Sequence, residues 1–146
     1  MKKSIYNKYM QLALLGVFFS FMLASDVTLS IGNVDEQNGS FDILYDTEQN
    51  IHGFQLEVLG VSFLDVTSDH FEIEHGTGTI LGFSMSEDAA ISIGQGTLAH
   101  VSYQLSSDVS SICIDSATIS GGSFPAVELS SSTGDCHAID LSIPIT

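Results

Sequence analysis

A histidine and two glutamates alternate with apolar residues along one short stretch of the chain. His70, Glu72 and Glu74 are separated by Phe71 and Ile73. In a β-strand, side chains two residues apart point to the same face, and an imidazole with two carboxylates could hold a divalent metal ion. The pattern is equally that of a solvated strand face opposite two buried residues. We favour this second interpretation and assign no metal ligands here.

A second acidic group surrounds the first strong turn signal, Asn38-Gly39. Its members are Asp35, Glu36, Asp42, Asp46 and Glu48. Calcium takes several oxygen ligands from acidic loops, so a calcium ion is a candidate at this turn. The spacing matches no EF-hand loop, and the pattern favours a solvated acidic rim with no cofactor. Asn38-Gly39-Ser40 also fits a glycosylation sequon, as well as it fits a hairpin turn.

Signals for catalysis are weak. Histidines occur at positions 52, 70, 75, 100 and 137, and serine is abundant, but there is no Gly-x-Ser-x-Gly elbow of the kind that presents a nucleophile. Carboxylate pairs that could hydrolyse glycosides stay open as chance pairs among eighteen acidic residues. We predict that the protein is not an enzyme.

The basic residues all lie at the N-terminus, ahead of an apolar run over residues 12–24. They are Lys2, Lys3 and Lys8. This order is typical of a secretory signal, and the run is shorter than the roughly 20 residues of a bilayer span. We therefore expect a signal peptide over residues 1–25, with an uncleaved anchor as the alternative. The remaining chain is expected to be secreted, extracellular or at the cell surface, without stable membrane insertion.

The body of the chain, from Asp26 onward, carries all eighteen carboxylates and no lysine or arginine. Such a surface cannot neutralise phosphates, and this excludes nucleic acid as a partner. The body also contains both cysteines, Cys113 and Cys136. An even pair in an exported protein indicates a disulfide, whereas a metal site would need more ligands at closer spacing. We therefore predict a Cys113–Cys136 bond that stabilises the fold by roughly 3 kcal/mol.

The hydrophobic period of the body is two, which predicts β-strands. Alternating triplets occur at Val27, Leu29 and Ile31, at Phe41, Ile43 and Tyr45, and at Phe54, Leu56 and Val58. Further strands are expected at residues 71–73, 79–85, 98–105, 112–119, 126–129 and 138–143, with 79–85 buried on both faces because it is continuously apolar. Short strands joined by glycine-rich turns predict an all-β fold, an antiparallel sandwich of two sheets.

Four stretches taken together resemble the cohesin domain family. They are residues 26–31, 53–56 (Gly-Phe-Gln-Leu), 80–84 (Ile-Leu-Gly-Phe-Ser) and 93–103, the last as a glycine turn at Gly94 and Gly96 followed by a long strand. Cys113 and Gly134-Asp135-Cys136 resemble the closing segment of a cohesin-like variant in which two cysteines bracket a hairpin. The resemblance predicts a cohesin-like, jelly-roll type β-sandwich domain over residues 26–143. Phe54, Phe83 and Tyr103 are its expected inward aromatics.

The resemblance implies a non-catalytic binding module, because cohesins hold dockerin partners on a sheet face and assemble polysaccharide-degrading enzymes. A protein partner of dockerin type or a polysaccharide is therefore expected. The alternatives are a carbohydrate-binding module proper and a self-associating surface structural protein. The chain has no tryptophan, and only Tyr45 and Phe124 are plausible exposed aromatics. No dockerin-contact residue can be carried over, because no motif fixes those positions.

Overall fold

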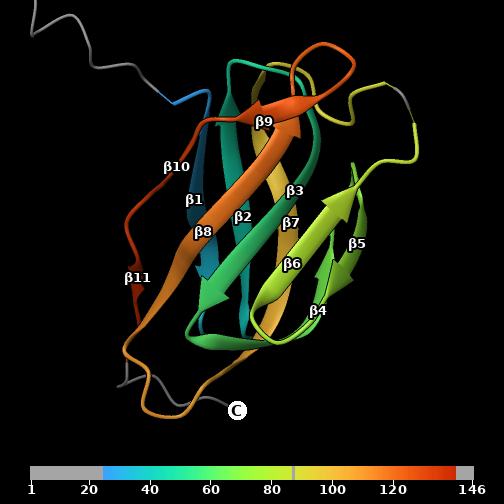
Figure 1. Ribbon diagram of the computed structural model, residues 1–146. Helices are drawn as coiled ribbons and strands as arrows, with labels where there is room; N and C mark the ends of the chain where they lie inside the picture. The colour runs from blue at the N-terminus through green and yellow to red at the C-terminus, as the bar shows by residue number, and fades with distance from the viewer. Residues whose placement is uncertain (1–24, 87, 141–146) are drawn as a thin grey trace, which may run out of the picture.

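The computed structural model describes residues 25–86 and 88–140 and contains two β-sheets packed face to face (Figure 1). The expected signal peptide at 1–25 lies almost wholly outside the described residues, as does the end of the expected domain at 141–143. Among the residues described, no helix is long and apolar enough to cross a membrane. The predicted all-β sandwich is confirmed.

The first sheet has the strand order β10-β1-β2-β7-β4, and the second has the order β11-β8-β3-β6-β5, with β9 paired to β8. The first five strands are β1 (Val27–Asp35), β2 (Ser40–Thr47), β3 (Ile51–Leu59), β4 (Val61–Thr67) and β5 (Glu72–His75). The others are β6 (Thr79–Phe83), β7 (Gly94–Leu105), β8 (Ser111–Gly121), β9 (Val127–Leu129), β10 (Ser131–Thr133) and β11 (His137–Ala138).

The core lies between the two sheets and is built from alternating residues of the long strands. Leu29 of β1 and Ile43 of β2 are fully buried, as is Leu56 of β3. Phe54 packs edge-on against Phe71, with ring centroids 5.1 Å apart. The predicted phases of these strands are confirmed, because Gln55 and Glu57 are exposed on the opposite face of β3.

Strand β6 differs from the prediction that it would be buried on both faces. Ile80 and Gly82 face the core, but Leu81 is 41% exposed and Phe83 is only partly buried. Phe83 is therefore not an inward aromatic, whereas Phe54 and Tyr103 are buried as expected. The cause is Gly82, where an added Cβ would collide with the ring of Phe54. The Phe54 ring occupies the core position that a side chain at 82 would fill.

Two strands were missed by the periodicity, and each has a physical reason. In β4 the pairing with β7 shifts between Phe63 and Asp65; this bulge breaks the alternation that marks a strand. Strand β10 consists of Ser131–Thr133 and pairs with β1 in parallel. The sequence pattern predicts antiparallel pairing throughout, and this prediction is wrong for β10. Its short polar sequence carries no periodic signal.

The glycine turn expected at Gly94 and Gly96 is wrong, because both residues already lie in β7 and pair with Thr47 and Tyr45 of β2. Gly94 does have a positive φ of 142°. Gly96 accommodates the Tyr45 ring, which an added Cβ would meet. The turn at Asn38-Gly39 is present, and Gly39 has a φ of 70°.

The C-terminal segment joins the two sheets. After β9 on the second sheet, the chain adds β10 to the first sheet and then returns to pair β11 with β8. Cys113 of β8 and Cys136 are joined by a disulfide with a Cα–Cα distance of 4.4 Å. The bond therefore holds the segment that precedes β11 against the second sheet (Figure 1).

Candidate docking face

The outer face of the β8–β3–β6–β5 sheet forms a regular grid whose rows follow from the strand register. One row runs from Thr118 through Gln55 and Leu81 to Glu74. The next runs from Ser120 through Gly53 and Phe83 to Glu72. Strand β6 thus places two apolar side chains between a hydroxyl-bearing strand and a carboxylate-bearing strand. We call this surface the docking face.

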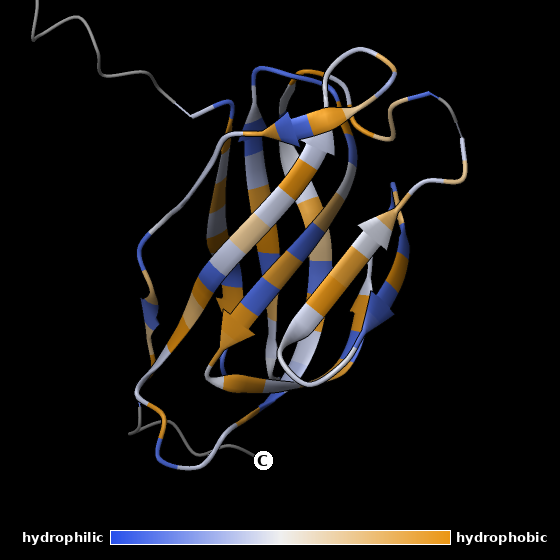
Figure 2. Ribbon diagram, viewed as in Figure 1, coloured by the Kyte–Doolittle hydropathy of each residue, from blue (hydrophilic) through white to orange (hydrophobic). Residues whose placement is uncertain are grey.

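The centre of the docking face is apolar. Leu81 and Phe83 both come from β6, which Figure 2 shows as a largely hydrophobic band beside the more hydrophilic β5. Gly53 lies next to Phe83 across the strands and has no side chain to cover the ring. A partner could therefore contact the exposed Leu81 and the uncovered part of Phe83 without displacing any part of the sheet.

The rim of the docking face is acidic, and its carboxylates have no cationic partner within residues 25–86 and 88–140. Glu57, Glu72 and Glu74 are exposed, and no described residue forms a hydrogen bond or ion pair with their carboxylates. Beyond Phe83 the face continues into a hollow of about 430 Å³ lined in part by His70, Glu72 and Met85. These carboxylates are available to a basic or hydroxylated partner.

The structure does not bring the three candidate metal ligands His70, Glu72 and Glu74 together. Glu72 and Glu74 lie on one face of β5, as predicted, and His70, which precedes the strand, lines the hollow with Glu72 but not with Glu74. Among the described residues, no group of three or more His, Cys, Asp or Glu side chains could hold a metal ion. The arrangement is that of a solvated acidic strand face.

The acidic residues around the first hairpin do not converge on one point either. Asp35 accepts hydrogen bonds from the backbone and side chain of Asn38 at 3.1 and 2.7 Å. These bonds hold the pKa of Asp35 below its usual value. Glu36 instead accepts from the His137 ring and from the backbone N–H of Asp140. The carboxylates of Asp35 and Glu36 are therefore bound to different partners.

Two carboxylates on the outer face of the opposite sheet have internal partners. The His100 ring donates to Asp42 with Nδ1 and Oδ1 2.6 Å apart, and Asn33 donates to the other oxygen of Asp42 at 2.8 Å. Gln95 of β7 donates to Asp46 of β2 at 2.9 Å. These contacts cross-link β1, β2 and β7.

The histidines do not form a nucleophilic site with any described residue. His52 contacts the carbonyl oxygen of Gly122, His75 lies edge-on to Phe63, and His100 and His137 contact carboxylates. Both thiols are consumed in the disulfide.

Sequence reasoning did not find the docking face, because it placed Leu81 and Phe83 in the core. The signal that could have found it is Gly82, which indicates a close approach of another side chain from one side of the strand. If Phe54 occupies that side, the neighbours of Gly82 in the sequence must face outward, since successive side chains alternate across a strand.

Solved cohesins share this architecture. The sixth cohesin of scaffoldin B from Acetivibrio cellulolyticus, solved in complex with a mutant Cel5 dockerin, matches with a TM-score of 0.55 and 12% identity over 75% of this chain and 95% of that chain. A chain of the CaDoc0917–CaCohA2 complex matches with a TM-score of 0.55 and 12% identity over 74% of this chain and 94% of that chain.

A non-cellulosomal cohesin from the hyperthermophilic archaeon Archaeoglobus fulgidus matches with a TM-score of 0.53 and 14% identity over 75% of this chain and 86% of that chain. No family model and no curated protein sequence matches the chain. At these identities the likeness concerns the fold and not the partner. Two antiparallel-rich sheets, closed near the end by β10 and β11, thus give this chain the cohesin-like fold.

Proposed function

We propose that this protein is a non-catalytic module that binds a dockerin-type protein partner on the docking face. The observation that carries the proposal is the exposed Leu81 beside the partly exposed Phe83, next to carboxylates that have no partner among the described residues. An apolar centre with a polar rim is the usual anatomy of a protein–protein interface. The solved neighbour from Acetivibrio cellulolyticus, which is bound to a dockerin, supports this class of partner.

The partner should present an apolar anchor together with basic or hydroxyl groups. The body of this chain has no lysine or arginine, so a basic partner would supply the permanent positive charges that the rim glutamates lack. Complementary charges at an interface mainly raise the association rate and the specificity. Binding is therefore expected to weaken as the salt concentration rises. The apolar contact to Leu81 is expected to supply the part of the binding free energy that does not depend on salt.

The module acts outside the cytoplasm in this proposal. The basic and then apolar order of the first 25 residues is typical of a secretory signal. A disulfide persists in oxidising compartments, and the Cys113–Cys136 bond supports export. Attachment of the secreted module to enzymes or surfaces that handle polysaccharides is the role that we infer.

The test is a binding measurement on matched variants. Purified dockerin modules and the proteins of a culture supernatant are offered, with and without calcium, to the mature protein and to Leu81→Glu. The control is Ile93→Glu, which places the same charge on an aliphatic residue that is 66% exposed just ahead of β7. Retention that is lost in Leu81→Glu and kept in Ile93→Glu supports the proposal. The proposal is contradicted if Leu81→Glu and Ile93→Glu are both retained. It is also contradicted if neither the parent protein nor Ile93→Glu is retained.

One observation favours a polysaccharide as the second candidate partner. Phe124 in the β8–β9 connection is 68% exposed, and Val127 nearby is 61% exposed. An exposed aromatic ring can stack on a sugar. Affinity electrophoresis through neutral polysaccharide gels separates the two functions, because retardation that disappears in Phe124→Ala and persists in Leu81→Glu would favour direct polysaccharide binding.

A further inference from the structure

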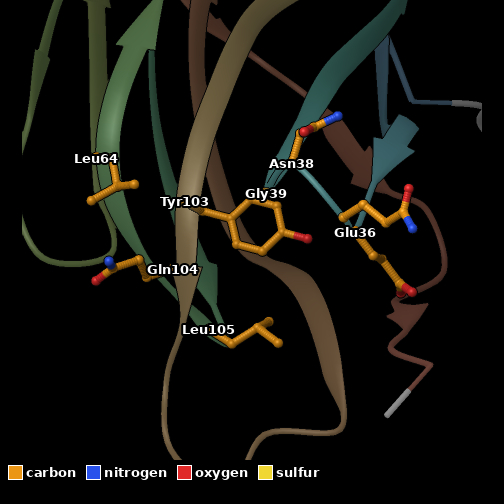
Figure 3. A pocket seen from close by; sticks show the side chains of 8 residues that line it. Glu36, Asn38, Gly39, Leu64, Tyr103, Gln104 and Leu105 are labelled. Carbon is orange, nitrogen blue, oxygen red and sulfur yellow. The ribbon is translucent and has the colours of Figure 1, made fainter. Parts of the chain in front are cut away.

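A cavity at one end of the sandwich lies apart from the docking face and has a lining of different chemistry. It has a volume of about 440 Å³ and lies between the β1–β2 hairpin and the paired ends of β4 and β7 (Figure 3). Its lining comprises Glu36, Gln37, Asn38, Gly39, Leu64, Tyr103, Gln104 and Leu105. The volume lies within the range of about 300–1,000 Å³ typical of ligand sites.

The wall of the cavity depends on a close backbone approach at Gly39. The N–H of Tyr103 donates to the carbonyl oxygen of Gly39 at 2.9 Å. A Cβ on Gly39 would lie 2.7 Å from the carbonyl oxygen of Tyr103, and its φ of 70° is left-handed. Both the close backbone approach and the left-handed φ favour glycine at position 39. The hairpin is therefore held directly against β7.

Tyr103 is the unusual residue of this cavity. The residue is only 5% exposed, and its ring packs on Phe41 with centroids 5.4 Å apart. Its hydroxyl nevertheless makes no hydrogen bond to a described residue, and Figure 3 shows it pointing along the cavity toward Glu36. No buried side-chain oxygen of the described residues lacks a partner, so the unpartnered Tyr103 oxygen is reached by solvent and is open to a ligand that enters the cavity.

The electrostatics of the cavity favour a cation. Burial and the negative charges of Glu36 and Asp35 raise the pKa of Tyr103, and the two carboxylates make the potential around its oxygen negative. Asn38 donates its amide to Asp35, which leaves its carbonyl oxygen free to accept. Leu64 and Leu105 add apolar surface beside these acceptors. An ammonium group with an apolar stem matches this lining.

We propose that this cavity binds a lysine side chain of a partner protein, with the ammonium between Tyr103 and Glu36 and the methylene stem against Leu64 and Leu105. A lysine ammonium carries three donors and no acceptor, which suits a lining of oxygen acceptors. The site uses none of the docking-face residues. A test of lysine binding at this cavity is therefore independent of a test of dockerin binding at the docking face.

The experiment titrates the full mature protein with Nα-acetyl-lysine N-methylamide, observed by amide NMR at neutral pH. We expect saturable shifts confined to the signals of Gly39, Tyr103 and Gln104 and their neighbours. The Nε-acetylated form of the same compound has the same stem without the charge and should produce no saturable shift. The arginine counterpart should bind more weakly, because its planar fork is wider than an ammonium.

Two variants test the assignment of the groups. Glu36→Gln keeps an acceptor for His137 and Asp140 and removes the charge, and we expect about tenfold weaker binding, since charge-assisted hydrogen bonds are roughly twice as strong as neutral ones. Tyr103→Phe keeps the ring on Phe41 and should weaken binding roughly threefold to tenfold. The matched control, Glu57→Gln on the docking face, changes the net charge equally and should leave the affinity unchanged.

Each opposite outcome overturns the proposal. Equal weakening by Glu36→Gln and Glu57→Gln would show diffuse attraction to an acidic protein and no site. Binding of the Nε-acetylated compound with equal affinity would show an apolar or hydroxyl-binding cavity. The spectra of the unliganded variants report whether each fold is intact, and a conserved spectrum with unchanged lysine affinity in Tyr103→Phe would exclude the phenol as a ligand-binding group.

Discussion

On the β1–β2–β7–β4 sheet, the outward carboxylates of Asp42 and Asp46 accept hydrogen bonds from histidine, asparagine and glutamine side chains. On the β8–β3–β6–β5 sheet, Glu57, Glu72 and Glu74 project from the outer face with no partner among the described residues. A body without lysine or arginine can satisfy its carboxylates only with imidazoles, amides, hydroxyls and backbone N–H groups. Asn33, His100 and Gln95 supply such donors to Asp42 and Asp46 on one sheet, whereas no described residue supplies one to the three glutamates on the other.

The largest expected effect concerns the core that supports the docking face. Phe54→Ala removes a side chain that is 3% exposed and that covers Gly82, so we expect a loss of about 3–5 kcal/mol in the free energy of unfolding. Equilibrium unfolding in urea measures this loss in the free energy of unfolding. The control Phe124→Ala removes an exposed ring and should change stability by less than about 0.5 kcal/mol. Equal effects of the two substitutions would mean that the β3–β6 packing is assigned wrongly.

Removal of the disulfide should have the next largest effect. Cys113→Ser combined with Cys136→Ser opens a loop with a sequence separation of 23, which is expected to cost roughly 3 kcal/mol on the chain-entropy model. Thermal unfolding of the double variant, compared with the reduced and oxidised parent protein, measures the effect. Since β11 then loses its anchor on β8, the second sheet should open first. An unchanged midpoint would contradict a structural role for the bond.

A direct comparison of one carboxylate from each face is the sharpest test. Asp42→Ala removes the acceptor for two hydrogen bonds and should destabilise the fold by about 1 kcal/mol. Glu57→Ala removes an exposed carboxylate without a partner and should be neutral or slightly stabilising, because it lowers the net negative charge. Unfolding curves at low salt resolve the difference. Equal losses would remove the distinction between the two faces.

The smallest effect is expected in the acid titration of Asp35. Hydrogen bonds from Asn38 lower its pKa from the usual 3.8, so this contribution to stability is present above about pH 4 and is lost as the pH falls through the lowered pKa. Asn38→Ala should move the Asp35 pKa up toward its usual value. Carboxyl-carbon NMR follows the titration directly, and an unmoved Asp35 signal would exclude Asn38 as the cause.

Much of the fold could be predicted because the core strands alternate strictly. Val27 and Leu29 in β1, and Phe54, Leu56 and Val58 in β3, are buried at the predicted phases. Strand β4 could not be found, because its bulge near Leu64 interrupts the alternation. The polar β10 could not be found either, because its position depends on parallel pairing with a strand about a hundred residues earlier.

The candidate sites were harder to predict, because they depend on contacts between distant residues. The exposed position of Leu81 follows from the ring of Phe54 lying over Gly82, and this pairing becomes visible only when β3 and β6 are placed side by side. The cavity at Tyr103 likewise requires the hairpin at Gly39 to meet β7. The disulfide is the exception, since two cysteines permit a single intramolecular pairing and the structure contains it.

The path of the chain through β9, β10 and β11 has a consequence for how the molecule opens. In this short segment, β9 pairs within the second sheet, β10 within the first sheet and β11 again within the second sheet. Neither layer can therefore separate without breaking backbone bonds that the other layer holds. Deep-lying amides of β1 and β8 should then exchange with solvent deuterium at one common rate, as members of a single cooperative unit.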